Sequence, residues 1–417
     1  MLERWQSGFG ALVILGFAFL LCPRVLRGRV RWRTIGAGLL LLVVLAGLVL
    51  RTPLNRVFDW ASRAVNAFLE LSNEGASFVF GPLVSDSARF GFIFAFQVLP
   101  TLIFFSAVMS ALYYIGLMPL LIRGAGRVLS RWLGTTGPES FSTIADIFVG
   151  QTEAPLVIKP YIATLTRSEL LACMTAGFAT TAGGVLAAYV IMLRELVPNI
   201  AGHLIACSVM SAPASLVIAK LILPEADQPA TADATTAPEI ERPAGGLLDA
   251  ITTGTSDGLK LALNVGAMLI AFIALTALVD LVLKHVGELV LQQPLSLELL
   301  LGWLFAPLAW LIGVSGDDVP KVASLLGQKT VLNEFVAYTT LTQKLAADPE
   351  WLSERSRILA SYALCGFANF SSVGIQIGGY SALAPERRSD LAQLAPRAML
   401  GGLLTTCLVA CVAGVLL

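Results

Sequence analysis

The stretch that decides the fold is Gly366-Phe367-Ala368-Asn369-Phe370-Ser371-Ser372-Val373-Gly374-Ile375-Gln376-Ile377-Gly378-Gly379, which places amides and hydroxyls inside an otherwise apolar chain. A helix that only crosses a membrane needs none of these polar groups. Burying each of them in hydrocarbon costs free energy unless it finds a partner. Because glycine permits backbone conformations that interrupt a helix, we expect a broken helix that lines a binding site for a solute.

The rest of the chain is strongly apolar. Of its 417 residues, 56% are hydrophobic and 13% are charged, and the mean hydropathy is +0.78. Soluble domains average about 25% charged residues, and several apolar runs here reach the roughly 17–25 residues that cross a bilayer. The composition predicts an all-α polytopic membrane protein. The net charge is zero, which indicates no nucleic-acid partner.

Apolar runs and arginine-rich loops predict the topology. We expect eight transmembrane helices, at residues 7–22, 34–50, 90–115 (interrupted by Pro100), 170–193, 201–223, 263–283, 357–379 and 399–417. Arginines cluster in the loops 24–33, 123–131 and 387–397, which the positive-inside rule places in the cytoplasm, so both termini lie outside. Residues 53–72 and 247–261 have polar residues on one side and are expected to form interfacial amphipathic helices.

Two shorter apolar regions each contain a polar elbow with a glutamate. The first elbow is Gly150-Gln151-Thr152-Glu153-Ala154-Pro155 and the second is Leu332-Asn333-Glu334-Phe335. Two half-length apolar arms around a polar elbow are typical of a re-entrant hairpin, whose irregular backbone is tolerated where it lines a cavity. A carboxylate at membrane depth is a candidate functional residue.

The two halves of the chain share one order of segments. Each elbow is followed by a helix with a related motif, Gly177-Phe178-Ala179-Thr180 in the first half and Gly366-Phe367-Ala368-Asn369 in the second. Paired, glycine-interrupted segments indicate the midplane site of a transporter, and the loop charges give the halves opposite orientations, as in an inverted repeat. A small-residue packing face is an equally good interpretation of 177–184.

The residue types at these positions limit the solute. Two glutamates, amides and hydroxyls suit a neutral, hydroxylated or heterocyclic molecule, because a carboxylate accepts from a diol and an amide pairs with a base edge. A phenylalanine packs on an aromatic ring. A small hard cation fits beside the site, where carbonyls and threonine hydroxyls gather at the break within 177–184.

Other classes of protein explain the sequence less well. An intramembrane enzyme needs a nucleophile with a base, or metal ligands, but the chain has two histidines and six cysteines, none of them in a CxxC pair. A channel needs a symmetric filter, which two different elbows do not form. We therefore expect no enzyme activity and no cofactor.

These segments closely resemble the concentrative nucleoside transporter family. The matching motifs are residues 148–156, 177–180, 331–338 and 365–379, and the resemblance covers residues 90–417. It implies a bacterial inner-membrane symporter that takes up nucleosides such as uridine, cytidine or adenosine with sodium. It also implies a homotrimer in which a transport domain moves like an elevator against a scaffold.

The resemblance also implies roles for individual residues. The residues implied for the nucleobase are Gln151, Thr152 and Glu153, those for ribose are Glu334, Asn369 and Ser372, and those for an apolar wall are Val185 and Phe367. The sodium site implied by the family lies at Asp146, Val149, Thr180 and Thr181, mainly through backbone carbonyls and hydroxyls. Asp146 stands where the family pattern has an asparagine, and Thr181-Ala182-Gly183-Gly184 replaces a pattern nearer Ile-Ala-Gly-Ser. A proton-coupled nucleoside symporter is therefore the alternative.

The expected domain organisation follows from the same comparison. Residues 1–89 would form peripheral or scaffold helices, and 90–135 and 247–314 would each form a scaffold helix with an interfacial helix. Residues 136–223 and 315–417 would form the two halves of the transport domain. The polar stretch 224–246, rich in Pro, Ala and Thr, would be a flexible cytoplasmic linker.

Overall fold

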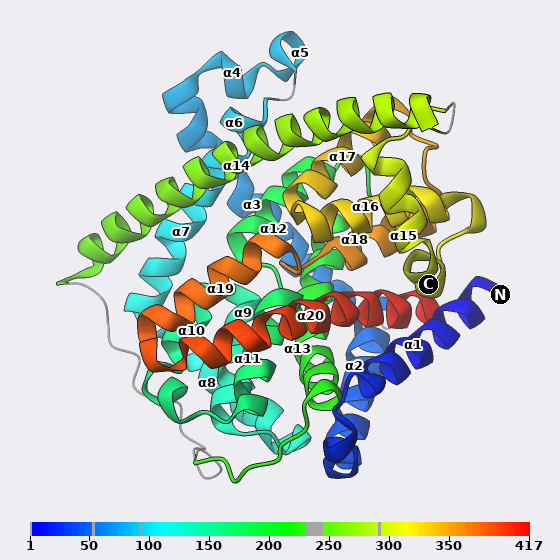
Figure 1. Ribbon diagram of the computed structural model, residues 1–417. Helices are drawn as coiled ribbons and strands as arrows, with labels where there is room; N and C mark the ends of the chain where they lie inside the picture. The colour runs from blue at the N-terminus through cyan, green and yellow to red at the C-terminus, as the bar shows by residue number, and fades with distance from the viewer. Residues whose placement is uncertain (1, 52–54, 92, 231–244, 291–292) are drawn as a thin grey trace.

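The computed structural model describes residues 2–51, 55–91, 93–230, 245–290 and 293–417, and it contains no β-strand within these ranges. Most of the expected linker 224–246, and the start of the expected amphipathic helix at 53, lie outside the described residues. Figure 1 shows a fold built of helices, in which the C-terminal helix α20 (Arg388–Leu416) crosses the middle of the view.

The N-terminal part of the chain extends from α1 to α7. Its elements are α1 (Leu2–Leu20), the 3₁₀ helix η1 (Arg24–Arg29), α2 (Trp32–Arg51), α3 (Asn55–Phe80), the one-turn helices α4 (Pro82–Ser85), α5 (Ser87–Phe90) and α6 (Phe94–Gln97), and α7 (Leu99–Tyr114). The expected crossing at 90–115 is interrupted at Val98, between α6 and α7, and Pro100 lies in the first turn of α7. Proline fits there since the first-turn N–H groups have no partner within the helix.

The first half continues with elements that contain both predicted irregularities. They are α8 (Leu117–Leu133), α9 (Gly137–Phe148), α10 (Ala154–Val157), the 3₁₀ helix η2 (Lys159–Thr164), α11 (Arg167–Ala179), α12 (Gly183–Leu193) and α13 (Ile200–Ile222). The elbow separates α9 from α10, and a helix break at 180–182 separates α11 from α12.

The second half of the chain follows the expected linker. They are α14 (Leu247–Val290), α15 (Leu297–Ile312), the 3₁₀ helix η3 (Gly316–Asp318), α16 (Val319–Val331), α17 (Glu334–Ala347), α18 (Glu354–Leu364), α19 (Phe370–Leu383), the 3₁₀ helix η4 (Pro385–Arg387) and α20 (Arg388–Leu416). The opening stretch of the sequence spans the break between α18 and α19 and most of α19.

The segments 247–261 and 263–283 form one helix, α14, rather than an amphipathic piece followed by a crossing. Two glycines of the first segment lie against α7. A Cβ on Gly254 would lie 2.7 Å from the Ser106 carbonyl oxygen, and one on Gly258 would lie 2.7 Å from Ile103 Cα. These glycines let α14 pack closely along α7 (Figure 1) instead of ending the helix.

Six helical segments are long and apolar enough to cross a membrane among the described residues. They are Trp32–Arg51, Phe94–Tyr114, Arg167–Leu193, Ile200–Ile222, Leu247–Leu289 and Pro385–Leu416. Each overlaps one of the eight expected crossings. The other two expected crossings fall on α1 and on the α18–α19 pair, which do not meet the same length and hydropathy. The chain is therefore a multi-pass helical membrane protein.

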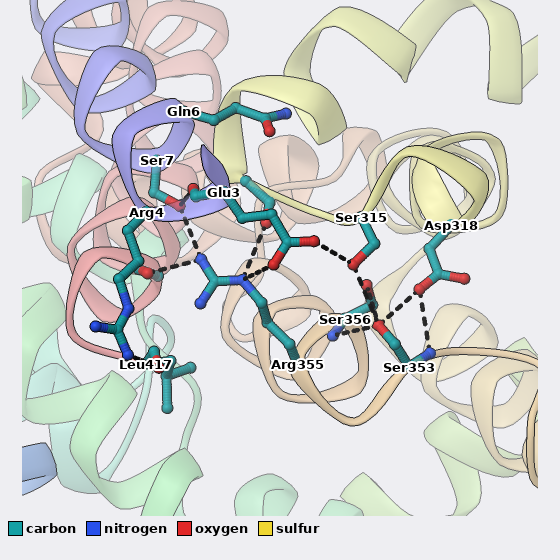
Figure 2. A network of polar contacts seen from close by, with 12 residues as sticks. Glu3, Arg4, Gln6, Ser7, Ser315, Asp318, Ser353, Arg355, Ser356 and Leu417 are labelled. Atoms are coloured by element: carbon teal, nitrogen blue, oxygen red, sulfur yellow. Dashed lines mark hydrogen bonds and ion pairs between the residues drawn. The ribbon is translucent and has the colours of Figure 1, made fainter. Parts of the chain in front are cut away.

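A network of polar contacts joins the two ends of the chain (Figure 2). Arg4 Nη2 donates to the Leu417 carbonyl oxygen at 2.6 Å, and Ser7 Oγ donates to the Ile312 carbonyl oxygen at 2.8 Å. Arg355, at the start of α18, pairs with Glu3 at 3.5 Å and donates to the Gly414 carbonyl oxygen at 2.7 Å. The network ties α1 to α15, α18 and α20.

Candidate functional site

Asparagine caps place the polar residues of the second half. Asn333 precedes α17, and its Oδ1 accepts from the Val336 N–H at 2.9 Å. Asn369 precedes α19, and its Oδ1 accepts from the Ser372 N–H at 2.8 Å. An asparagine side chain satisfies one of the unpaired N–H groups at a helix N-terminus. The caps therefore fix where the elbow and the break begin their helices.

The Glu334 carboxylate is held between two elements. Asn369 Nδ2 donates to Glu334 Oε2 at 2.8 Å, and the Tyr189 hydroxyl donates to Oε1 at 3.3 Å. Tyr189 in turn stacks on Tyr338 with ring centroids 4.1 Å apart. Glu334 is 4% exposed and Asn369 is 1% exposed. A buried carboxylate with two neutral donors retains acceptor capacity for further donors.

Gln151 connects the first elbow to α19. Its Nε2 donates to Ser372 Oγ at 3.1 Å, and its Oε1 accepts from Gln376 Nε2 at 3.1 Å. Gln376 Nε2 also donates to the Met174 carbonyl oxygen of α11 at 3.1 Å, although the two residues are 202 positions apart in the sequence. The first elbow, α11 and α19 thus share one buried polar network.

The two helix breaks lie directly against each other. The Gly366 N–H donates to Thr181 Oγ1 at 2.8 Å. Gly366 has φ +112°, and a Cβ there would lie 2.8 Å from the Ala179 carbonyl oxygen. A residue with a side chain would be strained in this backbone conformation and would collide with α11. Glycine at 366 is what allows the breaks to touch.

The remaining predicted solute residues have different surroundings. Thr152 and Glu153 are exposed at the first elbow, apart from the Gln151 network. Val185 is buried in α12 at 3% exposure, and Phe367 is half-buried within the second break. Ser371 Oγ donates to Asn369 Oδ1 at 2.7 Å, so this hydroxyl supports the cap of α19.

The predicted ion residues lie in α9, directly after it, and at the break between α11 and α12. Asp146 is 1% exposed, and neither carboxylate oxygen has a hydrogen-bond partner among the described residues. A Cβ on Gly177 would lie 3.4 Å from Asp146 Oδ1, so the carboxylate reaches the last turn of α11. Val149, Thr180 and Thr181 are buried as well, the first just after α9 and the other two at the break. Burying an unpaired carboxylate is costly unless a cation or proton neutralises it.

Hydroxyls at the first break have partners in α11 and at the second break. Thr180 Oγ1 donates to the Ala176 carbonyl oxygen at 2.9 Å, and Thr181 Oγ1 lies 3.3 Å from Cys365 Sγ. No group of three or more His, Cys, Asp or Glu side chains that could hold a metal ion gathers in the part of the chain that the structure describes. The atoms that could coordinate an ion at this site are oxygens of carbonyls, hydroxyls and one carboxylate. Such ligands suit a hard cation better than a transition metal.

Three residues of this region were not predicted: Tyr189, Gln376 and Lys329. The signal for Gln376 was its place as a single amide between the isoleucines 375 and 377 of an apolar helix. Lys329 had a similar signal, as a lysine beside the second elbow. Tyr189 had none, because a tyrosine in an apolar helix also suits a lipid-facing or packing position.

A multi-pass helical protein with a buried polar site between two facing helix breaks has the form of a solute transporter. Three family models match almost the whole chain: "Na+ dependent nucleoside transporter N-terminus" at residues 9–83, "Nucleoside recognition" at 95–196 and "Na+ dependent nucleoside transporter C-terminus" at 203–414. The chain belongs to the concentrative, Na⁺-dependent nucleoside transporter family, which is a family of transporters and not of enzymes.

Relatives in other organisms agree with this assignment. The chain is 44% identical to the Sodium/nucleoside cotransporter 1 of Rattus norvegicus, over 93% of this chain and 60% of the rat protein. It is 43% identical to the Uncharacterized transporter YutK of Bacillus subtilis (strain 168), over 97% of both chains. The chain thus spans about three fifths of the mammalian relative and nearly all of the bacterial one.

Solved structures share the fold. The chain matches CNTnw in an inward-facing substrate-bound state with a TM-score of 0.91 and 41% identity, over 99% of this chain and 98% of that one. It also matches a doubly substituted variant of CNTnw in an outward-facing state with a TM-score of 0.93 and 41% identity, over 100% of this chain and 99% of that one.

Proposed function

We propose that this chain is a secondary active symporter that takes up nucleosides across a bacterial inner membrane, driven by an inward sodium gradient. The observation that carries the proposal is the pair of contacts between the breaks and elbows, Gln151 to Ser372 and Asn369 to Glu334. These contacts assemble the family's motif residues from both halves of the chain into one buried polar site.

Ribose and base would be recognised by different parts of this site. Glu334, Asn369 and Ser372 would bind the ribose, because a carboxylate with free acceptor capacity binds the two hydroxyls of a diol. Gln151, Thr152 and Glu153 would bind the nucleobase, with Val185 and Phe367 as its apolar wall. The exposure of Thr152 and Glu153 is compatible with this role, since a base that reaches the first elbow would meet them.

The coupling ion would bind at Asp146, Val149, Thr180 and Thr181. The buried Asp146 carboxylate supports this assignment, because both of its oxygens lack a partner among the described residues. A sodium ion there would neutralise the carboxylate and accept further oxygen ligands from the break at 180–182. Ion binding would in this way organise the break that Gly366 and Thr181 join to the solute site.

The architecture supports transport by an elevator. Elements α9 with α10 and α16 with α17 would form two re-entrant hairpins, and α11–α12 and α18–α19 would form two broken helices of an inverted repeat. The chain would cross the membrane eight times with both termini outside, and three copies would assemble through the scaffold segments 90–135 and 247–314. Residues 136–223 and 315–417 would carry the solute.

The decisive experiment is uptake of radiolabelled uridine into proteoliposomes with and without an inward sodium gradient. We expect accumulation above equilibrium that requires the gradient and that cytidine or adenosine competes with. Equilibration that ignores the gradient would contradict secondary active transport. Accumulation driven equally by a proton gradient in sodium-free buffer would instead favour proton coupling, the alternative that the unpartnered Asp146 carboxylate supports.

A further inference from the structure

A buried lysine lies at the second elbow. Lys329 belongs to α16, is 0% exposed, and is among the largest fully buried side chains of the described residues. Its Nζ donates to the Ala363 carbonyl oxygen at 2.8 Å, to Thr406 Oγ1 at 3.1 Å and to the Cys365 carbonyl oxygen at 3.4 Å. Lysine is almost never fully buried unless its charge is compensated, so this position calls for an explanation.

Hydrogen-bond accounting shows that Lys329 is a cation. The Ala363 and Cys365 carbonyl oxygens can only accept. The Thr406 hydroxyl donates its hydrogen to the Leu403 carbonyl oxygen at 3.1 Å, so its oxygen also accepts from Lys329. Three acceptors need three N–H donors, which an ammonium group has and a neutral amine does not.

The charge is met by a helix end rather than by an acid. Ala363 lies in the last turn of α18, which ends at Leu364, and Cys365 follows it directly. The last carbonyls of a helix have no partner within it and carry a partial negative charge. Among the described residues no carboxylate forms an ion pair with Lys329, although Glu334 is five residues further on in the sequence. The ammonium therefore compensates the partial negative charge of the carbonyl groups at the end of α18, next to the break between α18 and α19.

The position of Asp146 in the first half corresponds to the position of Lys329 in the second half. Asp146 is the third residue from the end of α9 (146 in 137–148), and Lys329 is the third from the end of α16 (329 in 319–331). Asp146 lies beside Gly177 in the last turn of α11, whereas Lys329 binds the last turn of α18. One position carries a buried carboxylate without a hydrogen-bond partner among the described residues, and its counterpart carries an ammonium group.

We propose that the Lys329 ammonium is a tethered cation, which takes in the second half the place that the coupling ion takes beside Asp146 in the first half. It holds the carbonyl end of α18 so that Asn369 and Glu334 keep the geometry that binds ribose. Lys329 is thus a positioning residue, and the elevator carries one fixed and one exchangeable positive charge. The comparison with the coupling ion rests on the proposed function, but the cationic role of Lys329 does not.

Chemical rescue tests the proposal. Uridine binding is measured at equilibrium in detergent, at saturating sodium, for Lys329→Ala, Lys329→Met and the surface control Lys344→Ala, with added methylammonium chloride or choline chloride. Lys344 is 42% exposed and pairs with Glu298 at the surface. Alanine leaves room for a small cation, whereas methionine fills the same space with an uncharged chain.

We expect both Lys329 variants to bind uridine at least about tenfold more weakly than the wild type, since hydrogen bonds made by a charged group are stronger than those between neutral groups. Methylammonium, but not choline, should restore most of the affinity of Lys329→Ala and none of that of Lys329→Met. Lys344→Ala should bind as the wild type does in every salt. If Lys329 only filled space, Lys329→Met would bind uridine with nearly wild-type affinity and Lys329→Ala would bind more weakly.

Three outcomes would overturn the proposal: wild-type affinity in Lys329→Met, no response of Lys329→Ala to methylammonium, or a Lys329→Ala protein that stays unfolded when purified with methylammonium. Sodium-independent uridine binding by the wild type would contradict the proposed sodium coupling instead. The effect of methylammonium on uridine binding can be measured whether or not binding depends on sodium. Failure of the Lys329 proposal can therefore be distinguished from failure of the proposed sodium coupling.

Discussion

At the scale of single residues, the site is defined by Glu334. Its Oε2 accepts from Asn369 and its Oε1 accepts from Tyr189, at 2.8 and 3.3 Å. Glutamine has one acceptor oxygen and one donor nitrogen, so Glu334→Gln sets its amide N–H against one of these donors and also removes the charge. Charged hydrogen bonds contribute roughly 1.5–3 kcal/mol each, and we expect sodium-driven uridine uptake to fall by about two orders of magnitude.

A matched control separates this effect from a general loss of charge. Glu298→Gln removes a carboxylate that is 46% exposed and pairs with Lys344 at 3.5 Å. Exposed ion pairs contribute about 0–1 kcal/mol, so uptake should stay within about twofold of the wild type. Wild-type uridine affinity in Glu334→Gln would rule out its role in ribose binding.

At the scale of elements, a glycine permits the contact between the two breaks. Gly366 has φ +112°, and a Cβ there would lie 2.8 Å from the Ala179 carbonyl oxygen. Strained backbone of this kind costs about 1–3 kcal/mol. We therefore expect Gly366→Ala to lower the melting temperature in detergent and to abolish uptake.

Gly374 provides the comparison for that substitution. It lies within α19, and a Cβ there would meet no atom within 4 Å among the described residues. Alanine is favoured over glycine in a helix by up to about 1 kcal/mol, so Gly374→Ala should melt at the same temperature as the wild type or higher. Equal melting temperatures for Gly366→Ala and the wild type would show that the breaks do not depend on this glycine.

The junction of η3 with α18 should make stability depend on pH. Asp318 Oδ2 accepts from the Ser353 hydroxyl at 2.8 Å and from the Ser353 N–H at 3.1 Å (Figure 2). Burial raises the pKa of Asp318, but hydrogen bonds from Ser356 and Ser353 and the charge of Lys321 outweigh it, so that the pKa is lower than usual. The carboxylate therefore stabilises the fold above the unfolded value of about 3.9, and this contribution is lost as the pH falls through the lower, folded value.

Asp318→Asn tests this dependence. The variant should melt below the wild type at neutral pH, and the difference should shrink as the pH is lowered from about 5 to 3, where the wild-type carboxyl takes up a proton. Asp317→Asn, at the exposed neighbouring position, should match the wild type throughout. A difference for Asp318→Asn that is constant over this range would exclude the carboxylate as its source.

The helices show what a sequence of this kind can predict. Glycine motifs predicted interrupted helices within 177–184 and within 366–379, because the conformational freedom of glycine is a local property. They did not predict that 247–290 is one helix, since Gly254 and Gly258 are glycine because of their contact with α7. The same limit applies to Tyr189 and Lys329, whose partners Glu334 and Ala363 come from other elements.

At the scale of the whole molecule, α1 packs mainly with helices of the C-terminal half of the chain. It lies against α20, α15 and α13, and Glu3 pairs with Arg355 at 3.5 Å (Figure 2). In the proposed elevator, α13 and α20 move while α7 and α15 stay, and α1 packs more extensively on α20 than on α15. We expect α1 to move with α20, so that residues 2–20 belong to the moving part rather than to the fixed periphery.

Two cysteine pairs test this expectation. A Cβ on Gly8 would lie 3.7 Å from Val415 Cγ2, across the α1–α20 contact, and a Cβ on Gly184 would lie 3.5 Å from Phe105 Cβ, across the α12–α7 contact. The second distance suits a disulfide, and a short bifunctional reagent spans the first. The six native cysteines are free and buried, which limits competing reactions.

Cross-linking Gly8→Cys to Val415→Cys should leave uridine uptake close to that of the reduced sample, because both positions travel together. Cross-linking Gly184→Cys to Phe105→Cys should stop uptake until a reductant is added, because it joins a moving helix to a fixed one. Arrest by the first pair as well would place α1 with the scaffold. Uptake that survives the second cross-link would mean that α12 does not slide past α7, and the elevator would then have to divide the chain elsewhere.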